Sequence, residues 1–138
     1  MGDEYPVVKV AAVQAASVFL DREASTEKAC RLIREAGRNG ARVIGFPVGF
    51  IPAHPVWYHH HAATSVVSNR LAVALFKNSV EIPGPEIERL CAAARDVNAY
   101  VVMGTRDRSR ARREVDLRRQ LHGRHASSTS VNLIRHCF

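Results

Sequence analysis

Histidine is the residue type that clusters most clearly in this sequence. His59, His60 and His61 are consecutive, and His54 precedes them in the same segment. Imidazole can bind a metal ion or transfer a proton near neutral pH. Metal-binding histidines usually stand four residues apart on a helix or combine with other ligands, whereas three consecutive side chains diverge. The spacing therefore favours a polar loop or an interface segment, and we expect neither a metal nor another cofactor.

Three cysteines are the candidates for a thiolate nucleophile. Cys30 and Cys91 fall on apolar faces of expected helices, and Cys137 is next to the last residue. Cysteine is among the residue types most often buried when it has no catalytic role. We therefore expect Cys30 and Cys91 to be buried structural residues.

Positive charge is concentrated at the end of the sequence. The chain of 138 residues has a net charge of +7. Residues 1–105 carry eleven basic and ten acidic side chains, whereas residues 106–138 carry nine arginines, no lysine and three acidic side chains. Dense cationic segments bind nucleic acids through phosphates. The distribution assigns any such binding to the tail and excludes it for the nearly neutral remainder.

The first hundred residues alternate between strand-like and helix-like patterns. Val7–Ala15 is a nearly continuous apolar run, which predicts a strand buried on both faces. Asp21–Asn39 has apolar residues at helical spacing, with Ser25 or Thr26 as its cap and Gly40 to end it. Residues 42–46 then predict a short second strand that stops at Pro47.

A loop rich in proline and aromatic residues follows the second strand, from residue 47 to about residue 63. Residues 66–78 predict a helix, and a turn at residues 82–85 leads into another helix with Pro85 in its first turn. Ala99–Thr105 predicts a third strand. This order indicates an α/β architecture with parallel neighbouring strands, in which Leu32, Ile33, Ile87 and Leu90 face the sheet.

The pattern changes near Arg106–Arg108. Residues after this point show no sustained period, and residues 126–130 are small and polar. We expect residues 107–138 to form a disordered, Arg-rich tail because they offer no face to bury. The tail could bind nucleic acid non-specifically, although it has no aromatic before Phe138 on which bases would stack. The interpretation we favour is translation of a GC-rich gene in a shifted reading frame.

Four stretches within residues 7–106 are, in their order, VKVAAVQAA, EKACRLIREAGRNGARVIGFP, GFIPAHPVW and IPGPEIERLCAAARDVNAYVVMGT. Together they resemble the nitrilase (carbon–nitrogen hydrolase) superfamily. The FIP…HPVW loop is more similar to nitrilases than to amidases. The resemblance implies part of an α-β-β-α sandwich with its active site at the strand ends. It also implies hydrolysis of nitriles or amides by a cysteine thiolate, assisted by glutamate and lysine.

Carried over to this sequence, that catalytic set is not intact. The resemblance places the general-base glutamate directly after Phe46-Pro47, where this chain has Val48. The family's lysine and cysteine belong to segments after the third strand, and the tail cannot be matched to them. Cys137 has no family-like surroundings, and the lysines lie in other segments, at positions 9, 28 and 77. The sequence therefore predicts a truncated, inactive relative.

The resemblance also suggests substrate-binding positions. His54 stands where the family often has an aromatic residue, six positions after the base. Trp57 and Tyr58 could line a substrate pocket, or they could be core or interface aromatics. Both interpretations remain open for these two residues.

Three functions follow from these observations. The first is an inactive nitrilase-like protein, and the second is a non-catalytic protein that associates with itself or with full-length relatives. The third is a basic protein that binds nucleic acid through its tail. No apolar run is long enough to span a membrane, and residues 1–6 lack the features of a secretory signal. We therefore expect a cytoplasmic location and no membrane partner.

Overall fold

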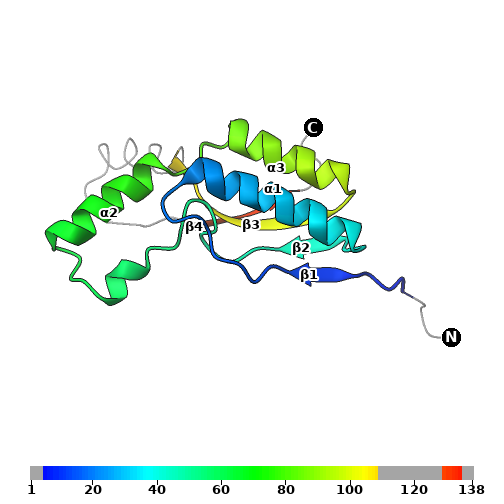
Figure 1. Cartoon of the computed structure of the whole chain (residues 1–138), viewed down its shortest axis with the longest axis horizontal. Coiled ribbons are helices and arrows are strands. Elements are labelled where there is room, and N and C mark those ends of the chain that lie inside the picture. The colour runs from blue at the N-terminus through cyan, green and yellow to red at the C-terminus, as the bar shows by residue number, and fades with distance from the viewer. Residues whose placement is uncertain (1–4, 109–128, 135–138) are drawn as a thin grey trace, which may run out of the picture.

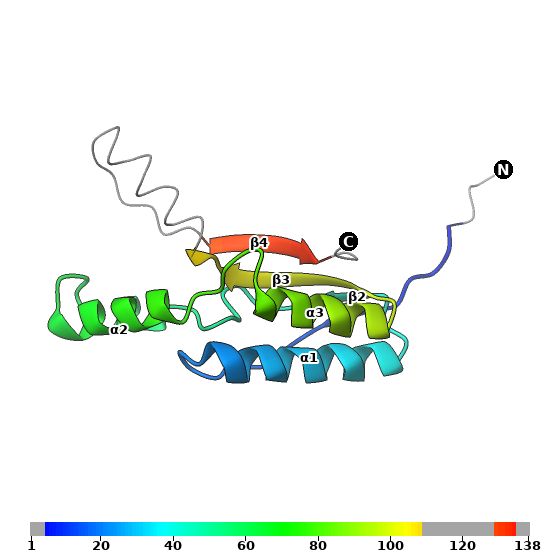
Figure 2. The ribbon, with the colours of Figure 1, turned by 90° about the horizontal axis from the view of Figure 1, so that it is seen from above.

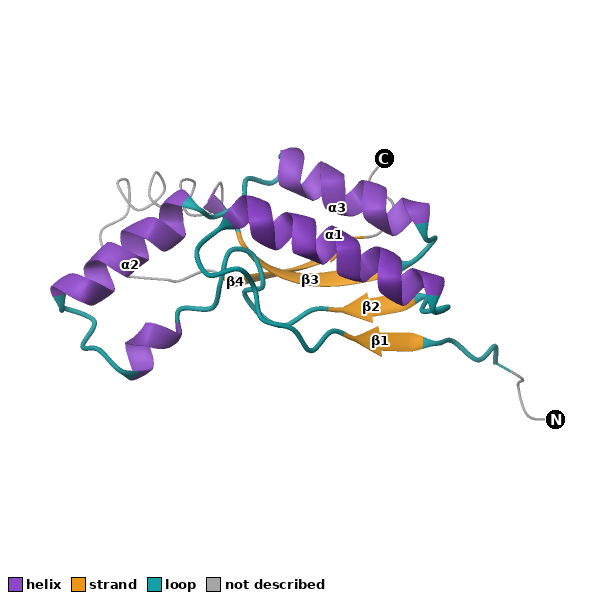
Figure 3. Ribbon diagram, in the orientation of Figure 1, coloured by secondary structure: helices purple, strands orange, loops and turns teal. Residues whose placement is uncertain are grey.

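The computed structural model describes residues 5–108 and 129–134 of the chain. Strands and helices alternate along most of this length, which confirms the predicted α/β class (Figures 1 and 3). The elements are β1 (Val10–Ala12), α1 (Arg22–Arg38), β2 (Val43–Gly45), the 3₁₀ helix η1 (Val56–His59), α2 (Val66–Lys77), α3 (Pro85–Asp96), β3 (Tyr100–Arg106) and β4 (Thr129–Ile134).

The strands form one sheet in the order β1-β2-β3-β4. β1, β2 and β3 are parallel, with Val43 of β2 beside both Val10 and Tyr100. This arrangement confirms the parallel neighbours expected from the sequence. β4 pairs with β3 in the antiparallel direction. This strand was not predicted, because residues 126–130 are small and polar and the segment shows no sustained period.

Helices α1 and α3 lie side by side on one face of the sheet (Figures 1 and 2). Ile33 and Leu90 are fully buried, and Leu32 and Ile87 pack against the core at its margin. The apolar stripes predicted for both helices therefore face the sheet. Their partners in the core are buried strand residues, namely Ile44, Val101 and Met103.

The N-cap of α1 differs from the expectation. Asp21, not Ser25 or Thr26, is the N-cap, and its carboxylate accepts a hydrogen bond of 2.9 Å from the Ala24 amide. Ser25 and Thr26 lie inside the helix and are fully buried, and the Ser25 hydroxyl donates to Val18 O. The predicted range Asp21–Asn39 is therefore correct and only the cap was assigned wrongly, because an aspartate caps a helix as well as a serine does.

The first strand is shorter and less buried than predicted. β1 comprises only Val10–Ala12, at one edge of the sheet. Ala11 packs against the helices, but Val8 and Val10 are 50% and 64% exposed. The apolar run predicted burial on both faces, whereas in the described structure only the helix side is covered.

The remaining elements extend past the carboxyl ends of the parallel strands. The loop after β2, η1 and α2 all lie at that end of the sheet (Figure 1). None of the helices in the described part of the chain has the length and apolar character needed to cross a lipid bilayer.

Candidate functional site

The loop after β2 is attached to β3 at both of its ends. Phe46 N–H donates to Val102 O at 2.9 Å, and Arg106 N–H donates to Ile51 O at 3.0 Å. Between these two attachments, residues 47–50 leave the ladder and form a short excursion. Its position at the carboxyl ends of parallel strands is where α/β sheets usually place functional groups.

A glycine in β3 makes the close approach of this excursion possible. A Cβ atom on Gly104 would lie 2.7 Å from Pro47 O and Val48 Cα, and 2.8 Å from Gly49 N. Gly49 itself has a φ of +66°, a left-handed conformation that glycine adopts without strain. The backbone of residue 48 is therefore held directly against β3.

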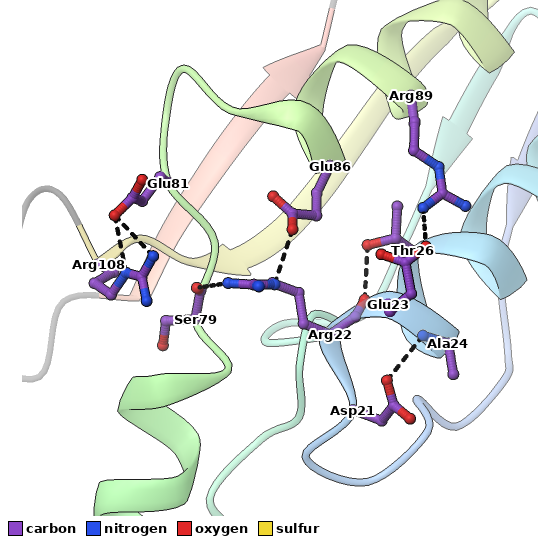
Figure 4. A network of polar contacts seen from close by, with 10 residues as sticks. All are labelled: Asp21, Arg22, Glu23, Ala24, Thr26, Ser79, Glu81, Glu86, Arg89 and Arg108. Carbon is purple, nitrogen blue, oxygen red and sulfur yellow. Dashed lines mark hydrogen bonds and ion pairs between the residues drawn. The ribbon is translucent and has the colours of Figure 1, made fainter.

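A second segment is held at the same end of β3 by polar contacts. Val80 N–H donates to Arg106 O at 2.9 Å, next to an ion pair of 2.7 Å between Arg108 and Glu81. Figure 4 shows that Arg22, from the start of α1, points toward the same connection between α2 and α3. These contacts fix the strand end against the start of the helical layer.

Arg22 is the central side chain of this network. Its guanidinium is 2.8 Å from a carboxylate oxygen of Glu86, in the first turn of α3, and donates to Ser79 O at 3.2 Å. Glu86 is buried, with only 8% of its side chain exposed. One arginine thus joins α1, the connection before α3, and α3 itself (Figure 4).

Val48 projects from the excursion with 54% of its surface exposed. Its side chain has no atom that can accept a proton. An open hollow of about 470 Å³ lies beside Pro47 and contains no ionisable side chain. It is lined by Ala12, Val13, Gln14, Ala15, Ala16 and Pro47. This end of the sheet therefore offers an accessible surface without a general base at residue 48.

The three predicted substrate-binding residues have different environments. Trp57 is buried and packs edge-on against Phe19, with ring centroids 6.0 Å apart. Tyr58 is 48% exposed, and its ring lies 5.5 Å from that of Trp57. His54 is exposed in the loop before η1. Trp57 is thus a buried aromatic, whereas the side chains of His54 and Tyr58 are exposed to solvent.

Arg106 is a charged group at the strand end that the sequence analysis assigned to the tail boundary. It is the last residue of β3, and burial lowers the pKa of its guanidinium, an effect that nearby Tyr58 opposes. Arginine nevertheless stays protonated at neutral pH. The strand was predicted to end at Thr105 because the arginines that follow were assigned to the tail.

The cysteines of the described chain lie in the helical layer and not at the strand ends. Cys30 in α1 and Cys91 in α3 are both buried, as predicted. Burial raises the pKa of the Cys30 thiol, while Arg34 and Arg89 act in the opposite direction. A raised pKa disfavours the thiolate, which is the nucleophilic form. Cys137 lies outside the described residues.

The described residues also contain no cluster of three or more His, Cys, Asp or Glu side chains able to hold a metal ion. The consecutive histidines at positions 59–61 are exposed and therefore belong to the surface of the loop region.

Sequence comparisons identify the family and several relatives of this chain. The model of the carbon–nitrogen hydrolase family matches residues 9–131. The chain belongs to the carbon–nitrogen hydrolase family. This match continues past residue 106, at which the four stretches that carry the resemblance end. It includes part of β4, which pairs with β3.

Several nitrilases are similar in sequence to this chain. An arylacetonitrilase of Hypocrea virens is 43% identical over 103 residues, covering 75% of this chain and 30% of the relative. A nitrilase of Bacillus sp. strain OxB-1 is 45% identical over 89 residues, covering 64% and 26%. An aliphatic nitrilase of Rhodococcus rhodochrous is 39% identical over 102 residues, covering 72% and 27%. The chain spans less than a third of the length of these relatives.

Proposed function

We propose that this 138-residue carbon–nitrogen hydrolase relative is nitrilase-like but does not itself hydrolyse nitriles or amides. The observation that carries the proposal is Val48. By resemblance, its position belongs to the glutamate that takes the proton from the nucleophilic thiol. Valine cannot accept a proton, and general acid–base catalysis usually supplies about 10²–10⁴-fold in rate.

The surroundings of Val48 support this proposal. The excursion is fixed by Gly104, so residue 48 cannot easily be replaced by a neighbouring carboxylate through a shift of the loop. The hollow beside Pro47 has no ionisable side chain in its lining. Cys30 and Cys91 lie in the helical layer, away from this loop. In the described part of the chain, the loop at residues 47–50 therefore has neither a general base at residue 48 nor a cysteine beside it.

Ammonia release from aliphatic and aromatic nitriles tests the proposal. We expect none above background for the parent chain. Val48→Glu should restore the local motif without restoring turnover, because base, lysine and cysteine act as a unit. The arylacetonitrilase of Hypocrea virens is the positive control for the assay. Turnover by Val48→Glu would mean that this chain contains a nucleophile and a lysine. Turnover by the parent would remove the assignment of residue 48 as the base position.

Association is a second candidate function, and the exposed valines at the β1 edge of the sheet favour it. Val10 in β1 and Val8 just before it are 64% and 50% exposed, and β1 is an edge strand. Exposed apolar surface and sheet edges promote pairing with another chain. The partner would be a second copy or a full-length relative. Nucleic-acid binding through the tail and a cytoplasmic location stay predictions. The disorder expected for the tail does not hold for residues 129–134, which form β4, and residues 109–128 and 135–138 lie outside the described structure.

A further inference from the structure

A groove lies between α1 and α3, the two helices that run side by side over the sheet (Figure 2). Its volume of about 400 Å³ is within the range of small-molecule sites. It is lined by Glu27, Cys30, Arg31, Arg34, Arg89 and Ala92. Three of these side chains are arginines and one is a glutamate, so the lining has an excess of two positive charges.

Each arginine of the groove has N–H groups left to donate to a ligand. Arg31 is exposed, and its side chain forms no hydrogen bond or ion pair within the described part of the chain. Arg34 donates to Asp96 through Nε and Nη2, at 3.2 and 3.1 Å, which leaves its Nη1. Arg89 donates to Glu23 through Nη1, which leaves its Nε and Nη2 (Figure 4). Because a guanidinium has five N–H donors, it can bind a second oxyanion while it keeps the first.

The charges of Arg34 and Arg89 act inside the groove as well as at its rim. Cys30 is only 6% exposed in the lining, and burial raises the pKa of its thiol. Both arginines act on this pKa in the opposite direction, and each has a larger effect than Asp96. Glu23 and Asp96, the partners of the two arginines, do not line the groove. An anion in the groove would therefore be attracted by the guanidinium groups more than it is repelled by these carboxylates.

We propose that this groove binds a small phosphate monoester. A phosphate group has three acceptor oxygens and nearly two negative charges at neutral pH, which match the three guanidinium groups and the excess charge of the lining. Arginine is favoured wherever phosphate oxygens are bound by paired donors. The rest of the groove accommodates the organic part of the ester. The proposal is independent of nitrile hydrolysis, because it concerns the helical layer and not the loop at residues 47–50.

An NMR titration of the full chain with glycerol 3-phosphate tests the groove. Glycerol, at the same ionic strength, is the matched ligand without a phosphate. We expect glycerol 3-phosphate to shift the backbone amides of residues 27–34 and 89–92, with a dissociation constant of about 1 mM, as a few charge-assisted hydrogen bonds would give. Glycerol should shift none of them.

Two substitutions in the lining should change the affinity in opposite directions. Arg31→Gln removes a charged donor and should raise the dissociation constant about 10-fold. Glu27→Gln removes the one acidic side chain of the lining and should lower the dissociation constant about 3-fold. A damaged fold would not produce such a gain. Arg38→Gln is the control, because Arg38 is exposed on the same helix outside the lining and its loss changes the net charge equally.

Three results would overturn the proposal. One is the absence of saturable shifts with glycerol 3-phosphate up to about 50 mM, which excludes even weak binding. Another is equal weakening by Arg31→Gln and Arg38→Gln, because the phosphate would then respond to net charge and not to the groove. The third is unchanged or weaker binding by Glu27→Gln. This last measurement decides the matter if Arg31→Gln fails to fold.

Discussion

At residue 48 the backbone is closely packed against β3, but the side chain lacks the chemistry that the resemblance assigns to this position. The backbone retains a tightly held excursion, with Gly49 in a left-handed conformation and Gly104 directly beneath it. The side chain is a valine, which cannot act as a base. The missing base could be predicted from the sequence because it depends on a neighbouring motif. The role of Gly104 could not, because it arises from an approach between segments more than fifty residues apart.

Gly104→Ala tests this close approach. The new methyl group would lie within 2.8 Å of three backbone atoms of residues 47–49, so the loop must move. We expect a loss of about 1–3 kcal/mol in the free energy of unfolding, the usual cost of overpacking. Gly45→Ala in β2 is the control, because its Cβ would meet nothing within 4 Å. That variant should be neutral or more stable by up to about 1 kcal/mol. Equal urea midpoints for both would contradict this account.

At the level of elements, the helices were the most predictable parts. Apolar spacing located α1 and α3 closely, and Gly40 ends the first of them with a φ of +86°. The strands were harder to predict, because an apolar run does not show whether both faces of the resulting strand are covered. β1 is therefore shorter than expected, and β4 was missed because its existence depends on pairing with β3.

The pair between Arg22 and Glu86 should stabilise the contact between α1 and α3. Glu86→Gln keeps the shape but removes the charge beside the guanidinium, and it also removes a favourable charge from the first turn of α3. We expect a loss of about 1–3 kcal/mol in the free energy of unfolding. Asp96→Asn is the control, since its pair with Arg34 is largely exposed. Exposed pairs contribute about 0–1 kcal/mol. Denaturation by urea at neutral pH compares the two, and a larger effect of Asp96→Asn would refute the argument.

The whole described molecule is a sheet with one covered and one open face. The sequence predicted the covered face through the helical stripes, because amphipathic periodicity is local. It could not predict the open face, since burial of β1 depends on what packs against it. The distribution of charge was also predictable, because residues 1–105 are nearly neutral whatever their fold. The packing of α1 and α3 on the covered face is the part of the described structure that the sequence predicted best.

The pH dependence of unfolding tests the packing between α1 and α3 through the buried thiol of Cys30. Burial between α1 and α3 raises the pKa of its thiol, whose Sγ donates to Arg89 O at 3.6 Å. An unfolded chain loses this proton more readily, near the ordinary cysteine pKa of about 8.5. The contribution of the buried thiol is therefore fully present below that value. It is lost as pH rises toward the raised pKa of the folded chain.

Urea unfolding between about pH 7 and pH 10, spanning the ordinary cysteine pKa, measures this loss in the parent and in Cys30→Ala. Other groups titrate equally in both chains, so the difference between them isolates Cys30. We expect the parent to be more stable at pH 7, because alanine leaves a cavity in the helical layer. Its advantage should shrink steadily above pH 8.5, since only the parent has a thiol whose ionisation favours unfolding. A difference that stays constant over the whole range would show that Cys30 ionises equally well in the folded chain. The packing of α1 against α3 around Cys30 would then be looser than the structure indicates.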